Sequence, residues 1–167
     1  MKKNRKNKKN AKIIRNRANA KGNPIIGNQK RNDYALANAI ATKAFNAGFY
    51  LEPITLYESL ISDRLSSRLN NLGNNKQDFD TLGELIGAMD KENNEKLRNF
   101  VKKEISEWKQ KRNKALHEIP KREEGDTRTA TEKYEECKAI AEEGKKLFNE
   151  LRNCIDRVRR AENKVKP

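Results

Sequence analysis

The stretch TATEKYEECKAIAEEGKKLFNELRNCIDRVRRAENK, residues 129–164, decides the fold. Its apolar residues recur every three or four positions over about seven turns. They are Tyr134, Ile140, Ala141, Gly144, Leu147, Phe148, Leu151, Ile155 and Val158. This spacing predicts one long amphipathic helix with a single apolar stripe. Such a stripe must be buried against other elements, which favours a helical bundle.

The preceding sequence contains shorter helical patterns with clear breaks between them. It predicts helices over residues 34–48, 52–72 and 94–119, and a short apolar segment over 79–89. The first of these helices carries Leu36, Ile40, Ala44 and Phe45 at helical spacing, which predicts its inward face. Pro120 stops the third helix. The expected fold is all-α, an antiparallel bundle of four longer helices plus one short helix.

Composition agrees with this class and limits the function. The chain has 167 residues, of which 37% are charged and 34% hydrophobic, with only 8 Gly and 4 Pro. No apolar run approaches the length of a transmembrane helix, and no secretory signal begins the chain, so we expect a cytoplasmic protein that binds no membrane. Cys137 and Cys154 would lie about 25 Å apart on one helix, too far for a disulfide. With a single histidine they also form no structural zinc site, so no metal or cofactor is expected.

The positive charge is concentrated at the N-terminus. Residues 1–31 hold 12 Lys or Arg and no acidic residue, whereas the rest of the chain holds 26 basic and 24 acidic residues. We expect residues 1–31 to be a disordered arm that binds RNA phosphates, and residues 32–167 to form the helical domain. The basic residues expected to contact RNA are Lys2, Lys3, Arg5, Lys6, Lys8, Lys9, Lys12, Arg15 and Arg17. A solubilising tail remains the alternative.

One residue of the predicted helix 94–119 does not fit its apolar stripe. Arg112 falls within the same sector of about 80° as the apolar side chains of this helix. Those side chains are Leu97, Val101, Ile105, Trp108, Ala115 and Ile119. A guanidinium on a core-facing stripe must be paired or line a polar cleft. A structural ion pair or a snorkelling arginine is the alternative interpretation of Arg112.

The only histidine of the chain follows Arg112 by five positions. Asn113 and His117 are four residues apart, so they are neighbours on one helix face. His117 also lies in the last turn before Pro120, where the helix dipole favours a protonated imidazole. Between them, Lys114 adds a further cation that is expected to bind RNA. Together these side chains are typical of a site that binds a phosphate and transfers a proton.

The element Arg112-Asn113-x-x-x-His117 resembles the signature of HEPN domains (higher-eukaryote and prokaryote nucleotide-binding domains). In that family the motif lies late in the helix that precedes the last long helix of a small bundle, and this chain has the same order. The resemblance covers residues 34–165 and not the basic arm.

The resemblance implies a metal-independent endoribonuclease in which the 2′-hydroxyl attacks the adjacent phosphorus and leaves a 2′,3′-cyclic phosphate. His117 would act as general acid or base, and Arg112 would bind the phosphate and stabilise its developing charge. Asn113 would orient the histidine or the phosphate. Because each chain has one histidine, chemistry that moves two protons needs two chains, and the resemblance likewise implies a homodimer.

Arg112 also needs a carboxylate partner if it is buried. Glu58 falls at the edge of the stripe that Ile54 and Ile61 form on the predicted helix 52–72, and we expect it to hold Arg112 in place. An exposed Glu58 paired with Arg64 or Lys43 is the alternative, and Glu104 and Glu107 are weaker candidates.

Compact members of the family imply a toxin or phage-defence effector, with a protein or RNA antitoxin as a possible further partner. Two other functions remain open at this point. One is a non-catalytic HEPN-like module that binds RNA or a partner protein. The other is a basic helical interaction protein in which the motif arose by chance.

Overall fold

The computed structural model describes residues 24–73, 81–118 and 124–165, and every regular element within them is helical. The long helices are α1 (Pro24–Asn46), α2 (Leu51–Asn71) and α6 (Ala130–Val165). A fourth long unit consists of α4 (Glu95–Phe100), a π-helical segment (Val101–Ile105) and α5 (Ser106–Glu118), while α3 (Leu82–Ala88) is short and ends in a 3-10 turn (Met89–Lys91). The predicted all-α bundle of four longer helices plus one short helix is confirmed.

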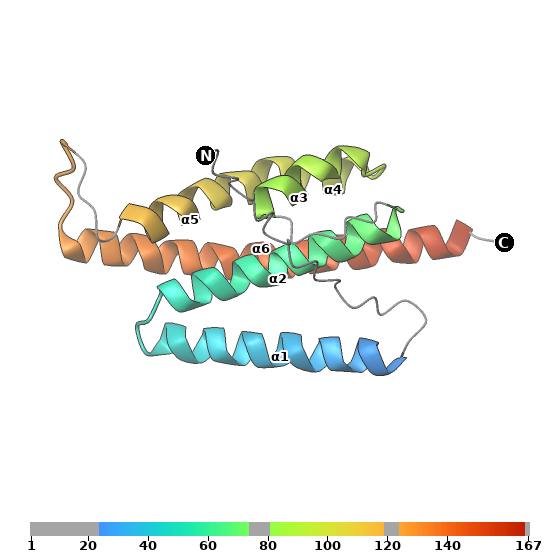
Figure 1. Ribbon diagram of the computed structural model, residues 1–167, viewed down its shortest axis with the longest axis horizontal. Helices are drawn as coiled ribbons and strands as arrows, with labels where there is room; N and C mark the ends of the chain where they lie inside the picture. The colour runs from blue at the N-terminus through green and yellow to red at the C-terminus, as the bar shows by residue number, and fades with distance from the viewer. Residues whose placement is uncertain (1–23, 74–80, 119–123, 166–167) are drawn as a thin grey trace, which may run out of the picture.

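The helices run in two directions along the bundle (Figure 1). Tyr134 at the start of α6 donates a hydrogen bond to the carbonyl of Gly48 just before α2, and Arg68 near the end of α2 pairs with Glu162 near the end of α6. These two contacts show that α2 and α6 run parallel. The other long units, α1 and α4–α5, run antiparallel to them and lie on opposite sides of the α2–α6 pair.

The core forms where the inward faces of α2, α4–α5 and α6 meet. Its largest fully buried apolar side chains include Trp108, Phe148, Ile54 and Leu151. The indole Nε1 of Trp108 donates a hydrogen bond to the carbonyl of Ile140 at 2.9 Å, which attaches α5 to α6. The predicted stripe of α6 is buried over most of its length, whereas Tyr134 near its start is largely exposed.

The π-helical segment keeps one face of the composite helix aligned with the core. Leu97, Val101 and Ile105 are spaced by four residues and are all buried. In a regular α-helix each step of four residues turns the side chain by about 40° away from its predecessor. The wider π turn reduces this drift. The face therefore still points inward at Trp108 and at the positions that follow.

The start of the first helix differs from the prediction. Helix α1 begins at Pro24, so residues 24–31, expected to belong to a disordered arm, are helical. Proline is well suited to a first helical turn. Lys30 and Tyr34 both bind the carboxylate of Asp63 on α2, which holds the N-terminal half of α1 against the bundle. Residues 1–23 lie outside the described residues.

The predicted inward face of α1 is confirmed for Ala44 and Phe45 and wrong for Leu36 and Ile40. Leu36 is 61% exposed and Ile40 39% exposed, whereas Ala41 and Ala44 are buried against the bundle. Small alanine side chains allow α1 to approach α2 closely. Leu36 and Ile40 were predicted to face inward because of their large apolar side chains, whereas the close contact with α2 favours the smaller alanines.

No helix within residues 24–73, 81–118 and 124–165 combines the length and the apolar character that crossing a membrane requires.

Gly144 is expected to tolerate no larger side chain. A Cβ at this position would lie 2.7 Å from Cζ2 of Trp108, which is buried and hydrogen-bonded. Gly144→Ala should therefore lower the free energy of unfolding by about 1–3 kcal/mol, although alanine favours the helix. Urea unfolding followed by circular dichroism measures the change.

The matched control for this substitution is Gly27→Ala in α1, where a Cβ would meet nothing within 4 Å. This variant should gain about 0.5–1 kcal/mol from helix propensity alone. Equal stabilisation by both substitutions would contradict the close α5–α6 packing.

Candidate active site

Arg112 lies on the inward side of α5, facing α2. Its side chain is 12% exposed and forms an ion pair with Glu58 of α2. The same guanidinium donates a hydrogen bond to the side-chain oxygen of Asn113, while its buried Nε has no hydrogen-bond partner within the described part of the chain. Burial lowers the pKa of Arg112, but a guanidinium stays protonated at neutral pH. The site therefore holds a permanent, partly desolvated positive charge.

The position of Arg112 follows from its neighbours on α5. The segment Ser106–Glu118 consists mainly of Lys, Glu, Gln, Arg, Ala and Leu, which are strong helix formers. Trp108 and Ala115, one turn before and one turn after, are both buried and fix which face of the helix meets the core. Arg112 must share that face. The sequence-based prediction that Arg112 is largely buried is confirmed.

Glu58 reaches Arg112 because it lies between two core positions of α2. Ile54 and Ile61 are fully buried, and the side chain of Glu58 is 25% exposed at the edge of their stripe. The predicted contact between Glu58 and Arg112 is present, and the alternative partners considered for Arg112 on its own helix are not needed. The ion pair crosses between two helices, so it can hold the guanidinium in one orientation.

Asn113 and His117 lie around the helix from Arg112 toward solvent. Asn113 is half-buried and His117 is exposed. On a regular helix, His117 lies about 140° around the axis from Arg112, one turn nearer the end of α5. The three side chains therefore form a surface along which exposure to solvent increases. It runs from the held cation through an amide to an imidazole that is open to a substrate or to a second protein chain.

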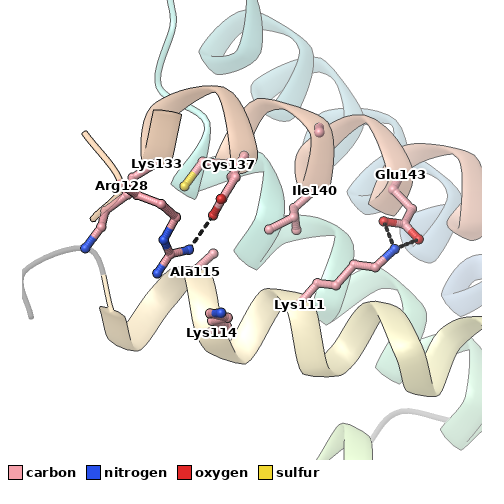
Figure 2. A pocket seen from close by; sticks show the side chains of 10 residues that line it. Lys111, Lys114, Ala115, Arg128, Lys133, Cys137, Ile140 and Glu143 are labelled. Atoms are coloured by element: carbon pink, nitrogen blue, oxygen red, sulfur yellow. Dashed lines mark hydrogen bonds and ion pairs between the residues drawn. The ribbon is translucent and has the colours of Figure 1, made fainter. Parts of the chain in front are cut away.

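A pocket of about 350 Å³ lies between α5 and α6, on the other flank of α5 from Asn113 and His117 (Figure 2). Its lining includes Lys111, Lys114, Ala115, Arg128, Cys137 and Ile140. Lys111 spans the two helices by pairing with Glu143 of α6 at 2.9 Å. Lys114, which was predicted to bind RNA, is exposed at the pocket and lies three residues before His117 on the helix. The wall of the pocket thus combines basic side chains with the carboxylates of Glu136 and Glu143, which pair with Arg128 and Lys111.

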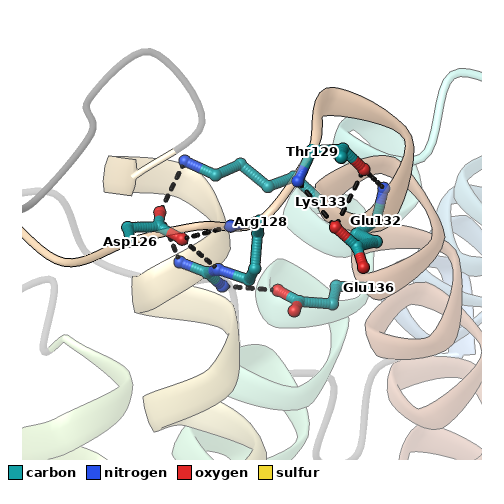
Figure 3. Close-up of polar contacts among 6 residues, drawn as sticks. All are labelled: Asp126, Arg128, Thr129, Glu132, Lys133 and Glu136. Carbon is teal, nitrogen blue, oxygen red and sulfur yellow. Dashed lines mark hydrogen bonds and ion pairs between the residues drawn. The ribbon is translucent and has the colours of Figure 1, made fainter.

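The start of α6 closes one end of this pocket with a polar network (Figure 3). Thr129 and Glu132 form a reciprocal capping box at the first turn of α6. Asp126 accepts ion pairs from Arg128 at 2.8 Å and from Lys133 at 2.9 Å. The hydrogen bonds from Arg128 and Lys133 hold the pKa of Asp126 well below its ordinary value. This network fixes the chain that enters α6, and with it the position of Arg128 in the pocket.

Other chemistries find little support in this region. Cys137 is buried, and burial raises the pKa of its thiol, so the reactive thiolate is disfavoured. Both cysteines are free and lie on α6. Within the described ranges, no three His, Cys, Asp or Glu side chains are arranged to hold a metal ion. Arg112, Asn113 and His117 are the chemically distinctive group on α5.

The remaining predicted RNA contacts belong to the basic arm. Lys2, Lys3, Arg5, Lys6, Lys8, Lys9, Lys12, Arg15 and Arg17 lie outside the described residues. Arg128 and Lys133, which line the pocket between α5 and α6, were not predicted from the sequence. They follow α5 by a break of several residues, and no periodic pattern links the two segments. Their contacts with Asp126 are local, spanning two and seven residues, whereas their place opposite Lys111 and Lys114 of α5 is a result of tertiary structure.

Comparison of the chain with protein-family models, with curated protein sequences and with solved structures gives no match in any of the three.

Proposed function

We propose that the protein is a metal-independent endoribonuclease that cleaves RNA through a 2′,3′-cyclic phosphate. The observation that carries this proposal is the arrangement on α5. Arg112 is held by Glu58 of another helix, and Asn113 and an exposed His117 follow it toward solvent. A desolvated guanidinium beside a solvent-accessible imidazole suits phosphate binding and proton transfer. The resemblance to the HEPN motif supports the same chemistry.

In the proposed reaction, the 2′-hydroxyl oxygen forms a bond to phosphorus while the bond from phosphorus to the 5′-oxygen breaks. One imidazole accepts the proton of the 2′-hydroxyl, and a protonated imidazole donates a proton to the leaving 5′-oxygen. Arg112 stabilises the negative charge that builds on the non-bridging oxygens. Because the chain contains one histidine, the two imidazoles come from two copies of the protein. The proposed active unit is therefore a homodimer with His117 of both copies at one site.

The experiment that tests the proposal is RNA cleavage by purified protein in excess EDTA, followed by analysis of the product ends. We expect cleavage to persist and to leave a 2′,3′-cyclic phosphate and a 5′-hydroxyl. Loss of cleavage on chelation would contradict metal independence. RNA binding without any cleavage would instead support the non-catalytic binding module.

Glu58 is proposed as a positioning residue that acts through Arg112. Glu58→Gln keeps the shape of the side chain but loses the charge of the ion pair, so we expect kcat to fall about ten- to hundred-fold with a smaller change in KM. Glu58→Asp should recover part of the loss because it restores the carboxylate. Glu107→Gln, an exposed position on α5, serves as the control. Equal kcat values for Glu58→Gln and wild type would exclude the proposed role of Glu58 in positioning Arg112.

The basic arm is proposed to strengthen RNA binding through phosphate contacts. Because residues 24–31 belong to α1, the informative truncation removes residues 1–23 only. It should weaken affinity about ten-fold or more at low salt and reduce the slope of log affinity against log salt. Fluorescence anisotropy with labelled RNA measures both. A variant in which every Lys and Arg of residues 1–23 is replaced by Gln should behave as the truncation does. Unchanged RNA affinity in both proteins would exclude this role of the arm.

A toxin or phage-defence effector in the cytoplasm, held inactive by a protein or RNA antitoxin, is the biological setting that we propose for this activity. Compact HEPN ribonucleases, which the motif resembles, are commonly of this type.

A further inference from the structure

Arg64 and Arg159 lie at one level of the bundle, where α1, α2 and α6 are close together and away from the candidate active site. Arg64 of α2 stacks its guanidinium over the ring of Tyr34 of α1, with Cζ 4.7 Å from the ring centroid. Arg159 of α6 is half-buried and lies three residues before Glu162, as Arg64 lies four residues before Arg68. Since α2 and α6 run parallel and Arg68 pairs with Glu162, Arg64 and Arg159 lie at the same level of the two helices, and the charges of Arg64 and Arg68 both act on Arg159. Two positive side chains from different helices thus lie close together in a partly desolvated position.

Neither guanidinium is neutralised within the described part of the chain. No carboxylate there lies within 4.0 Å of Arg64 or Arg159, and the buried Nε of Arg64 has no hydrogen-bond partner. The carboxylate of the nearby Asp63 pairs with Lys30 and accepts a hydrogen bond from the hydroxyl of Tyr34. Burial lowers the pKa of Arg159, the charge of Arg64 lowers it further, and Asp156 opposes this only in part.

Arg68, one turn after Arg64 on α2, shows the contrast. It binds the carboxylates of both Glu92 and Glu162 through four hydrogen bonds. The charge of Arg68 is therefore fully compensated, whereas Arg64 and Arg159 have no carboxylate in ion-pair distance among the described residues. Such an arrangement is unfavourable unless an anion occupies it.

We propose that Arg64 and Arg159 form a binding site for a phosphate group, distinct from the candidate active site. Two guanidinium groups offer planar pairs of N–H donors that match the oxygens of a phosphate, and the phosphate charge removes the repulsion between them. The ring of Tyr34 covers one face of the Arg64 guanidinium, so this contact does not use the N–H donors, which lie in the plane of the group.

The position of the site favours a backbone phosphate of RNA as the source. Lys30 and Tyr34 of α1 contact α2 at this level, so α1 begins at this end of the bundle, and residues 1–23 that precede it hold 10 Lys or Arg and no acidic residue. Arg159 lies about 24 Å further along α6 than Glu143, the partner of Lys111 next to Arg112. An RNA strand extending from the candidate active site could reach this pair. The phosphate site itself does not depend on ribonuclease activity.

The first part of the test measures binding of inorganic phosphate to the full chain. At constant ionic strength, phosphate should raise the thermal midpoint relative to chloride in wild type and in the control Arg157→Gln, an exposed arginine of α6. The shift should be lost in Arg64→Gln and Arg159→Gln, with affinity reduced about ten-fold or more. In chloride, Arg159→Gln should be at least as stable as wild type, because it removes the repulsion between the two guanidinium groups. If Arg159 had only a structural role, this substitution would instead lower the stability.

The second part uses a short 2′-O-methyl RNA, which cannot be cleaved, so the result is independent of catalysis. Weaker RNA binding by Arg159→Gln than by Arg157→Gln identifies the RNA backbone as the source of the phosphate. Equal RNA binding, with the phosphate shift still lost, identifies a small free phosphate compound. If neither phosphate nor RNA distinguishes the two variants, the proposed site does not exist.

Discussion

His117→Ala is expected to reduce the rate of RNA cleavage by about 1,000-fold, since a positioned acid or base contributes roughly 10²–10⁴-fold. The residue is the only histidine of the chain and is exposed near the end of α5. Because it is exposed, its loss should leave the free energy of unfolding within about 0.5 kcal/mol of wild type. Single-turnover cleavage of a labelled RNA, with urea unfolding in parallel, separates the two quantities.

Gln110→Ala is the matched control for this substitution. Gln110 is exposed on nearly the same face of α5, two turns before His117, and should retain full activity. The pH dependence of the cleavage rate gives a second readout, because removal of the group that transfers the proton should flatten the rate profile. Cleavage by His117→Ala at the wild-type rate, or with an unchanged pH profile, would exclude it as the proton-transfer group.

Mixtures of wild-type and His117→Ala protein test whether two chains each contribute a histidine to one site. If two copies of His117 act at one site, each heterodimer of wild type and His117→Ala has only one imidazole. Activity should then fall more steeply than the fraction of wild-type chains in the mixture. A decrease in simple proportion would show that each chain acts alone.

Arg68→Met is expected to destabilise the protein by about 3–5 kcal/mol at neutral pH, the usual cost of removing one partner from a buried ion pair. Arg68 is 1% exposed and Glu92 is 0% exposed, and the guanidinium binds Glu92 at 2.6 and 2.9 Å. It also joins α2 to the end of α6 through Glu162. Without the guanidinium, Glu92 is left as a buried and uncompensated charge. Urea unfolding measures the loss, and Arg157→Met, at an exposed position, should change stability by less than about 0.5 kcal/mol.

The pH dependence of this loss has a defined sign. Burial alone would raise the pKa of Glu92, but hydrogen bonds from Arg68 and from the backbone N–H of Asn94 hold it below its ordinary value of 4.5. In wild type, Glu92 therefore contributes stability above that value, and the contribution is lost as the pH falls through its native pKa. In Arg68→Met only the backbone N–H of Asn94 still offsets the burial of Glu92, so protonation of Glu92 relieves most of the penalty. The difference between the two proteins should narrow as the pH is lowered, and a constant difference would contradict this account.

Several features of the site were predictable because each depends on the local pattern of the chain. The periodicity of residues 129–164 predicted the long helix α6. The presence of a charged residue on each of two apolar stripes predicted that Arg112 and Glu58 would meet. Both are arguments from which face of a helix is apolar, and burial of apolar side chains is the dominant force in folding.

Other features were decided only by tertiary structure. The sequence by itself determined the helices, the inward position of Arg112 and the exposed face that carries His117. Tertiary structure alone decided that α2 and α6 run parallel, that α1 buries its alanines rather than Leu36 and Ile40, and that Arg68 joins Glu92 to Glu162. The physical reason is that helical periodicity is set by neighbours three or four residues apart. The direction and rotation of one packed helix relative to another depend on side chains that are distant along the chain.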